Sequence, residues 1–332
     1  MKKIDSLLAL AGLFVLFAAR SGATTITGNF TNNPSLDGWR IFGDTNLFQW
    51  DSANQNLAVT WDSSQTNSYF YHPLGTVLTR YDDFSVAFDL RLHDIGRNSD
   101  DPIKTNSFEL AIGFLNLGEA TQTNYLRGTG YNSPDLVEFD YFWDSGYGAT
   151  VWPAFVDSFG DFNYNSSFDY AVFALTPDDW YHVVMTYTAS NQTLVTTLTN
   201  FEQTAGVGIS QPVSDYFADY RVDAISISSY SDAGQDPTYG EGSILAHVAV
   251  GNFAITIPPP PIQNLAGAFS NGVWQAQFTA PTNWLYTLQR SADFQAWTNV
   301  SPATPGTGTN LFLPDASAPA GGAFYRIEAD RP

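Results

Sequence analysis

The chain has 332 residues, a formal net charge of −20 and no cysteine. A strongly acidic surface repels polyanions, which excludes nucleic acid as a partner, and the lack of cysteine excludes stabilisation by disulfide bonds. The 25 Phe, 17 Tyr and 9 Trp can instead supply a sizeable core for one large domain or two unequal ones.

Residues 1–23 have the pattern of a signal peptide. Lys2 and Lys3 precede an apolar run at residues 7–19, and the small residues 21–23 form a cleavage site. The run is too short to span a bilayer, and no other segment has the unbroken apolar length of a membrane helix. We therefore expect a protein that is secreted or held at the cell surface and is not integral to a membrane.

Residues 24–256 consist of short apolar or alternating runs separated by Gly, Asn, Asp, Ser and Pro. Such runs predict strands. They lie at residues 56–61, 84–90, 107–114, 137–144, 180–187, 192–198, 224–228 and 245–255. Residues 176–179 and 214–220 are candidates for single helical turns. Many short antiparallel strands favour an all-β sandwich or jelly roll.

Four consecutive prolines interrupt the strand pattern at residues 258–261. Such a run forms a stiff polyproline II spacer, so residues 257–263 are expected to be a linker. Beyond it, residues 264–332 contain alternating runs at 273–278, 284–290 and 323–327. They predict a small C-terminal β-sandwich domain of the fibronectin type III kind.

The strand at residues 137–144 carries an unusual set of acids. Residues two apart in a strand share a face, so Glu138 and Asp140 point one way, while Phe139 and Tyr141 point the other. Neighbouring carboxylates occur where a cation, a shared proton or a sugar hydroxyl stabilises them. Glu138, Asp140 and Asp144 are therefore candidates for metal binding or catalysis, and a hydrogen-bonded structural pair is the alternative.

Aromatic residues flank these acids. Tyr141, Trp143, Tyr147 and Trp152 are candidate ligand-binding residues, because exposed rings stack on sugar faces while nearby carboxylates accept hydrogen bonds from hydroxyls. Burial of the same rings in the core is the alternative. The four histidines lack metal-ligand spacing, and the two within predicted strands, His182 and His247, are expected to be hydrogen-bonded strand residues.

Two segments carry a resemblance to a known superfamily. Residues 179–187, followed by 191–194, resemble the concanavalin A-like, laminin-G-like jelly rolls, and Val137-Glu138-Phe139-Asp140 resembles the metal-binding strand of legume lectins. The resemblance implies a jelly-roll domain over residues 24–256, with Glu138 and Asp140 as metal ligands and Asp144 as a further ligand. The histidine of the lectin pattern is absent downstream, which favours one calcium ion with oxygen ligands over a transition metal.

The same superfamily includes retaining glycoside hydrolases. In those enzymes the strand holds a glutamate nucleophile, an aspartate at plus two and a glutamate acid/base at plus four or five. Counted from Glu138, those last positions are Phe142 and Trp143, and the next acid is Asp144.

These observations lead to three hypotheses about function. The first is a secreted, noncatalytic carbohydrate- or surface-binding protein whose partner is a neutral polysaccharide or cell-surface glycan, with calcium as its one candidate cofactor. The second is a glycoside hydrolase or polysaccharide lyase that uses Glu138 with Asp140 or Asp144. The third is a structural adhesion or matrix protein in which both domains act as spacers.

Overall fold

The computed structural model describes residues 23–96, 109–127, 133–145, 147–163, 169–234, 243–270, 273–319 and 322–331. The predicted signal peptide lies outside these residues except for Ala23.

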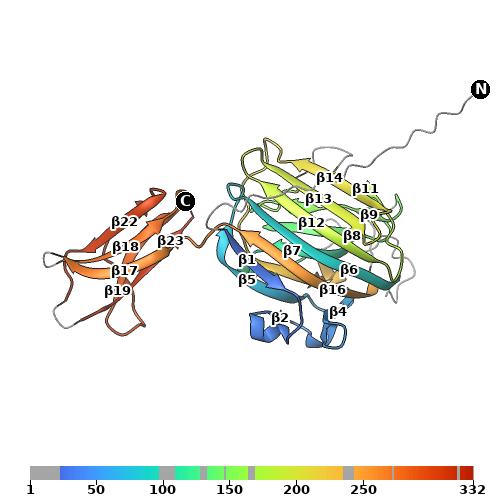
Figure 1. Cartoon of the computed structure of the whole chain (residues 1–332), viewed down its shortest axis with the longest axis horizontal. Helices are drawn as coiled ribbons and strands as arrows, with labels where there is room; N and C mark the ends of the chain where they lie inside the picture. Colours follow the sequence, from blue (N-terminus) through green and yellow to red (C-terminus); the bar gives the residue numbers. More distant parts are fainter. Residues whose placement is uncertain are drawn as a thin grey trace, which may run out of the picture.

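Two antiparallel sheets, which we call sheet A and sheet B, face each other in a β-sandwich (Figure 1). In sheet A, the order is β14 (Gly206–Pro212), β13 (Thr193–Asn200), β12 (Trp180–Thr188), β6 (Phe84–Gly96), β16 (Leu245–Ile257), β4 (Asn56–Asp62) and β3 (Phe48–Asp51), with β1 (Thr24–Gly28) also paired to β16. In sheet B, it is β11 (Ala171–Val172), β9 (Thr150–Val151), β8 (Leu136–Phe142), β7 (Glu109–Leu115), β15 (Val222–Ser229), β5 (Ser68–Leu78) and β2 (Arg40–Phe42), with β10 (Ala154–Val156) also paired to β8. The predicted all-β sandwich is confirmed.

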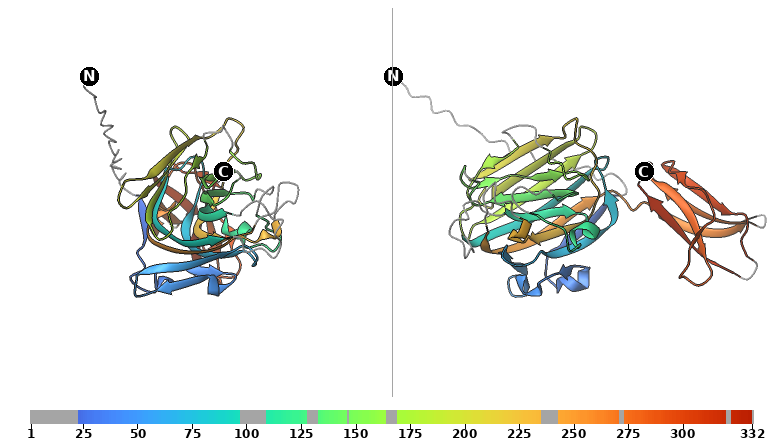
Figure 2. Two further views of the ribbon diagram at one scale, coloured as in Figure 1. Left: turned by 90° about the vertical axis from the view of Figure 1, so that its right-hand side faces the viewer. Right: turned by 180° about the vertical axis from the view of Figure 1, so that it is seen from behind.

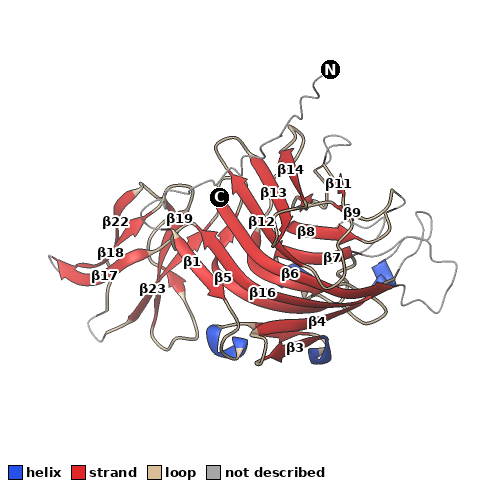
Figure 3. Cartoon of the chain, turned by 45° about the vertical axis from the view of Figure 1, so that its right-hand side comes forward, coloured by secondary structure: helices blue, strands red, loops and turns tan. Residues whose placement is uncertain are grey.

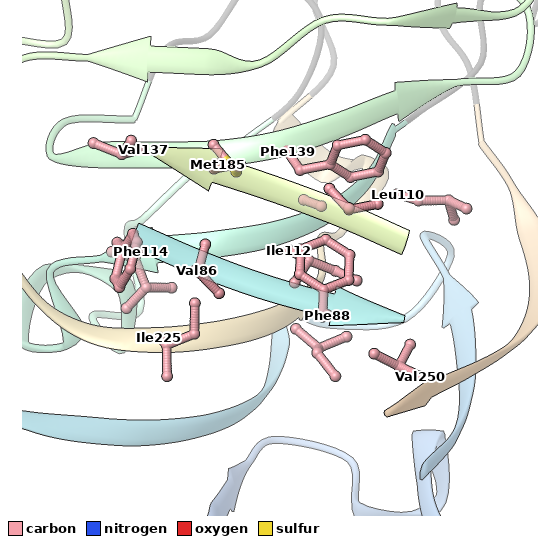
Figure 4. Packing of buried hydrophobic residues seen from close by; sticks show 14 of the residues in the cluster. Val86, Phe88, Leu110, Ile112, Phe114, Val137, Phe139, Met185, Ile225 and Val250 are labelled. Atoms are coloured by element: carbon pink, nitrogen blue, oxygen red, sulfur yellow. The ribbon is translucent and has the colours of Figure 1, made fainter. Parts of the chain in front are cut away.

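The core lies between the two sheets and follows from the alternation along each strand. Every second residue of a strand points inward, such as Phe88 on β6, Met185 on β12 and Phe139 on β8 (Figure 4). The rings of Phe88 and Phe139, one from each sheet, meet edge to face with their centroids 5.8 Å apart. Burying each such side chain stabilises the fold by about 1.5–3 kcal/mol.

The helices are short and few among the described residues (Figure 3). The α-helix α1 (Leu117–Ala120) begins where the side chain of Asn116 accepts a hydrogen bond from the backbone N–H of Glu119, at 3.2 Å. The 3₁₀ turns are η1 (Pro34–Asp37), η2 (Thr45–Leu47) and η3 (Asp232–Gly234). In the part of the chain that the structure describes, no helix is long and apolar enough to cross a membrane.

Both predicted helical turns are wrong. Asp178 has φ +67°, which no right-handed helix contains, and the chain then enters β12 directly. At residues 214–220, one hydrogen bond from the N–H of Phe217 to the carbonyl of Ser214 closes a turn that does not continue. The predicted strands occur with small shifts; the one expected at residues 137–144 ends at Phe142 as β8.

The C-terminal residues form a second, smaller sandwich (Figure 2). It has its own apolar cluster, which includes Phe278, Tyr286 and Leu288. One sheet contains β17 (Gln263–Ser270), β18 (Val273–Ala280) and β22 (Thr309–Asp315); the other contains β20 (Thr298–Asn299), β19 (Leu285–Ser291), β21 (Thr304–Pro305) and β23 (Phe324–Asp330). The finer assignment to the fibronectin type III kind stays a prediction, as do the boundaries at 256 and 264.

The two sandwiches touch through Arg331. Its guanidinium donates to Asp82 Oδ2 at 2.5 Å and to the carbonyl of Val77 at 3.3 Å, and it lies 4.1 Å from the centroid of the Trp284 ring. Asp82 and Val77 belong to the first sandwich and Trp284 to the second. The proline run is therefore not the only link between the two units.

Candidate functional site

Strand β8 is buried on both faces. Val137, Phe139 and Tyr141 point into the sandwich core, so Glu138 and Asp140 point away from it, onto the outer face of sheet B. The predicted common face of the two acids is confirmed. Their exposed fractions are nevertheless only 0% and 1%, because further segments of the chain cover this outer face.

A cluster of three carboxylates and one guanidinium occupies this covered face. Nη2 of Arg127 lies 3.0 Å from Glu109 Oε1, 3.4 Å from Asp140 Oδ2 and 3.7 Å from Glu138 Oε2. The hydroxyl of Tyr230 donates to Glu138 Oε1 at 2.6 Å, and the guanidinium lies 5.3 Å from the centroid of that ring. We call Glu109, Arg127, Glu138 and Asp140 the acid–arginine cluster.

Small residues on the neighbouring strands make room for this cluster. Ala111 and Gly113 on β7 lie directly opposite Asp140 and Glu138 in the strand register. A Cβ on Gly113 would come within 2.4 Å of the Glu138 Cα, so only glycine fits there. On the next strand Ser226 and Ser228 continue the row of small side chains. Arg127 contacts the two acids beside these small residues from outside the sheet.

Burial dominates the electrostatics of the acid–arginine cluster. It raises the pKa of Glu138 to about 7; the charge of Arg127 and the Tyr230 hydrogen bond oppose this shift, while Glu109 adds to it. Burial also raises the pKa of Asp140 well above its usual value, against the effect of Arg127 and with that of the two glutamates. Proton uptake therefore lowers the negative charge of this cluster near neutral pH.

The cluster does not fit a resident metal ion. The space between the three carboxylates already holds the Arg127 guanidinium, and an ion at the same place would have to displace it. Asp144, the third predicted ligand, lies half-buried beyond the end of β8. Among the described residues no group of three His, Cys, Asp or Glu side chains is placed to hold a metal.

The cluster also does not present a catalytic carboxylate to a substrate. A pKa near 7 would suit a general acid or base, but such a group must reach the substrate within hydrogen-bond distance. Glu138 has no exposed surface, and Asp140 has almost none. Within the described residues, both side chains are buried and do not line an open groove of the kind that a hydrolase or lyase needs.

The predicted ligand-binding aromatics separate into two places. Tyr141 and Trp143 line a pocket of about 410 Å³ at one end of the sandwich, on the core side of sheet B. His93, Asp94 and Pro177 contribute to the same pocket. Trp143 is half-buried, whereas Tyr141 is buried and its hydroxyl accepts from the N–H of Leu175 at 3.2 Å.

Tyr147 and Trp152 belong instead to an aromatic cluster near the edge of sheet B. Tyr170 lies between them, with its ring centroid 6.0 Å from that of Tyr147 and 5.2 Å from that of Trp152. Tyr147 is 72% exposed and Trp152 is half-buried. Phe155, next along the chain, is wholly buried in the core.

Three histidine–aspartate pairs lie on sheet A and its border, and the sequence pattern did not predict them. Nδ1 of His93 is 2.7 Å from Asp178, Nδ1 of His182 is 2.7 Å from Asp89, and Nδ1 of His247 is 2.8 Å from Asp94. The last two pairs are directly opposite across β12–β6 and β16–β6. Only the strand register brings them together, because their members are far apart in the chain.

No protein-family model matches the sequence, and no curated protein is significantly similar to it. Several solved structures are similar to the chain. Lectin II from Ulex europaeus is 14% identical, with a TM-score of 0.45, over 72% of this chain and 100% of the lectin. Peanut lectin is 16% identical, with a TM-score of 0.41, over 71% of this chain and 97% of the lectin.

The winged bean acidic lectin, whose structure contains methyl-α-D-galactose, is 14% identical, with a TM-score of 0.43, over 71% of this chain and 98% of the lectin. These proteins are legume lectins, the group that the sequence resemblance names. With TM-scores below 0.5, these similarities assign no ligand and no residue role to this chain.

Proposed function

We propose that the protein is a noncatalytic carbohydrate-binding protein whose ligand enters the pocket lined by Trp143. The observation that carries this proposal is the pocket itself, which combines an accessible indole with an imidazole and a carboxylate. Its volume of about 410 Å³ lies within the range of small-molecule sites, roughly 300–1,000 Å³.

The chemistry of the lining suits a sugar ring. The Trp143 indole would stack on the apolar C–H face of the ring, while the Asp94 carboxylate would accept hydrogen bonds from hydroxyl groups. His93 is oriented by its Nδ1 contact with Asp178, so Nε2 is the ring nitrogen that would meet a hydroxyl. With two aspartates beside the pocket and a chain charge of −20, a neutral glycan is favoured over an acidic one.

The proposal does not include calcium at Glu138 and Asp140, because Arg127 lies between their carboxylates. Glycan binding is therefore expected to be the same with calcium and with a chelator. Export from the cell is part of the proposal and rests on the pattern of residues 1–23. Mass spectrometry of the mature N-terminus after expression in the native host would test it.

The binding test uses an array of neutral glycans, followed by calorimetry with the strongest ligand. Trp143→Ala is expected to weaken binding at least about tenfold, since stacking of this kind contributes roughly 1 kcal/mol or more beyond the buried area. Trp50→Ala is the matched control, because Trp50 is also a partly exposed indole but lies on β3, outside the pocket. Undiminished binding by the Trp143 variant, or no binding by the wild type, would overturn the proposal.

A further inference from the structure

The guanidinium of Arg127 lies where a cation is required. Three carboxylates converge on its Nη2 within 3.0–3.7 Å, and all four side chains are at most 6% exposed. Water cannot screen such a group of acids, so an uncompensated cluster would strongly destabilise the fold. The positive charge comes from the chain itself.

The backbone of Arg127 is fixed from two directions. A Cβ on Gly234, in η3, would come within 2.4 Å of the Arg127 carbonyl oxygen, so the two backbones are in direct contact. On the other side the hydroxyl of Ser133 donates to the carbonyl of Leu126. Arg127 is therefore held where the segment between β7 and β8 meets η3, over the outer face of sheet B.

The surroundings of the cluster are built for a permanent charge. The rings of Tyr69, Tyr125 and Tyr230 are buried around it, and burial raises the pKa of each hydroxyl, so they remain neutral. A guanidinium keeps its charge at every physiological pH and offers several donors in a fixed plane. An ammonium or a metal ion would need a different arrangement of oxygen atoms.

We propose that Arg127 supplies the positive charge that a metal ion would otherwise have to supply. The acid–arginine cluster then holds η3 and the segment between β7 and β8 against sheet B without a metal ion. The proposal is independent of glycan binding, because it concerns only the folded state. It follows that removal of the guanidinium leaves three buried carboxylates without a compensating charge, and that a metal ion does not replace it, because no three acids among the described residues are placed to hold one.

The test compares thermal unfolding of the full chain in a chelator and in millimolar calcium. The wild-type midpoint is expected to be the same in both. Arg127→Met keeps the length of the side chain without its charge, and its midpoint is expected to fall by about 10 °C in chelator and by the same amount in calcium. Arg40→Met, at an exposed arginine on β2, is the matched control and should respond like the wild type.

Two results would overturn the proposal. One is a wild-type midpoint that falls in chelator, which would mean that a metal ion is present after all; this measurement remains decisive if Arg127→Met does not fold. The other is an Arg127→Met midpoint equal to that of Arg40→Met. An Arg127→Met midpoint that falls equally in chelator and in calcium would support the proposal. Partial recovery in the double variant Arg127→Met/Glu138→Gln, which removes one of the uncompensated carboxylates, would support it too.

Discussion

The outer faces of the two sheets carry similar residues in different environments. On sheet A, Asp89 and Asp94 pair with histidines whose side chains remain 50% and 48% exposed. On sheet B, Glu138 and Asp140 pair with an arginine that is 6% exposed. The alternation of acids along a strand therefore does not determine whether those acids are exposed or buried. The segments that cover a sheet decide whether an ion pair is a weak surface contact or part of the interior.

The largest expected difference concerns removal of one acid from each face. Glu109→Ala takes the nearest carboxylate from Arg127 and leaves a buried charge with fewer partners, which should cost about 3–5 kcal/mol of unfolding free energy. Asp94→Ala removes the partner of the half-exposed His247 and should cost less than about 1 kcal/mol. Urea unfolding of both variants measures the contrast. Equal losses would show that burial is not what distinguishes the faces.

The second difference is in pH dependence. The pKa of Glu138 is about 7 in the folded protein and near 4.5 in the unfolded chain, so the folded state binds the extra proton between these values. Its contribution to stability is complete below about pH 4.5 and is lost as the pH rises through 7, a change of up to roughly 3 kcal/mol.

Glu138→Gln should reduce this loss of stability between pH 5 and pH 8, as measured by urea unfolding across that range. The slope should not vanish, because burial raises the pKa of Asp140 in the same direction. Asp94→Asn, an exposed amide substitution on sheet A, should keep the wild-type profile. If Glu138→Gln also kept the wild-type profile, Glu138 would not be the group that binds the extra proton.

The third prediction tests the close approach of β7 and β8 beside the acid–arginine cluster. Gly113→Ala places a Cβ against the backbone of Val137 and Glu138, so β7 and β8 must move apart. The expected cost is about 1–3 kcal/mol, as for other overpacked sites. Gly208→Ala is the control, because its Cβ would meet only a methyl group of Thr197 at 3.8 Å. Similar unfolding free energies for the two variants would contradict the close approach of β7 and β8.

The sequence contains enough information to predict the faces of β8 but not what covers them. Strand alternation correctly placed Glu138 and Asp140 together and Phe139 opposite, because the period of a strand is local. Arg127 lies in a segment between β7 and β8 that has no periodic pattern, so nothing local connects it to the acids. The chain has only 13 Lys and Arg for 33 acids, so each basic residue is a candidate partner for a buried carboxylate. A search for a basic residue close in sequence to the acidic strand would have found Arg127.

The same limit applies to the histidines. His182 and His247 are predicted correctly as strand residues, but the aspartate that pairs with each lies on another strand, up to 153 residues away in the sequence. For His247 and Asp94 the pairing also depends on irregularities in the β16–β6 register, which shifts between His247 and Val248 and again between Gly251 and Ala254. Such shifts follow from packing of the whole sandwich, so residue patterns alone do not predict them.

The smallest expected effect is on the open face of sheet A. His182→Gln removes the contact between the imidazole and Asp89, which should contribute less than about 1 kcal/mol to the free energy of unfolding. The Asn252 amide, 2.6 Å from the other Asp89 oxygen, remains to hold that carboxylate. In about 1 M salt, where the Debye length is about 3 Å, the difference from wild type should disappear. A difference that persists in salt would show that the contact between His182 and Asp89 is shielded from solvent, as the acid–arginine cluster of sheet B is.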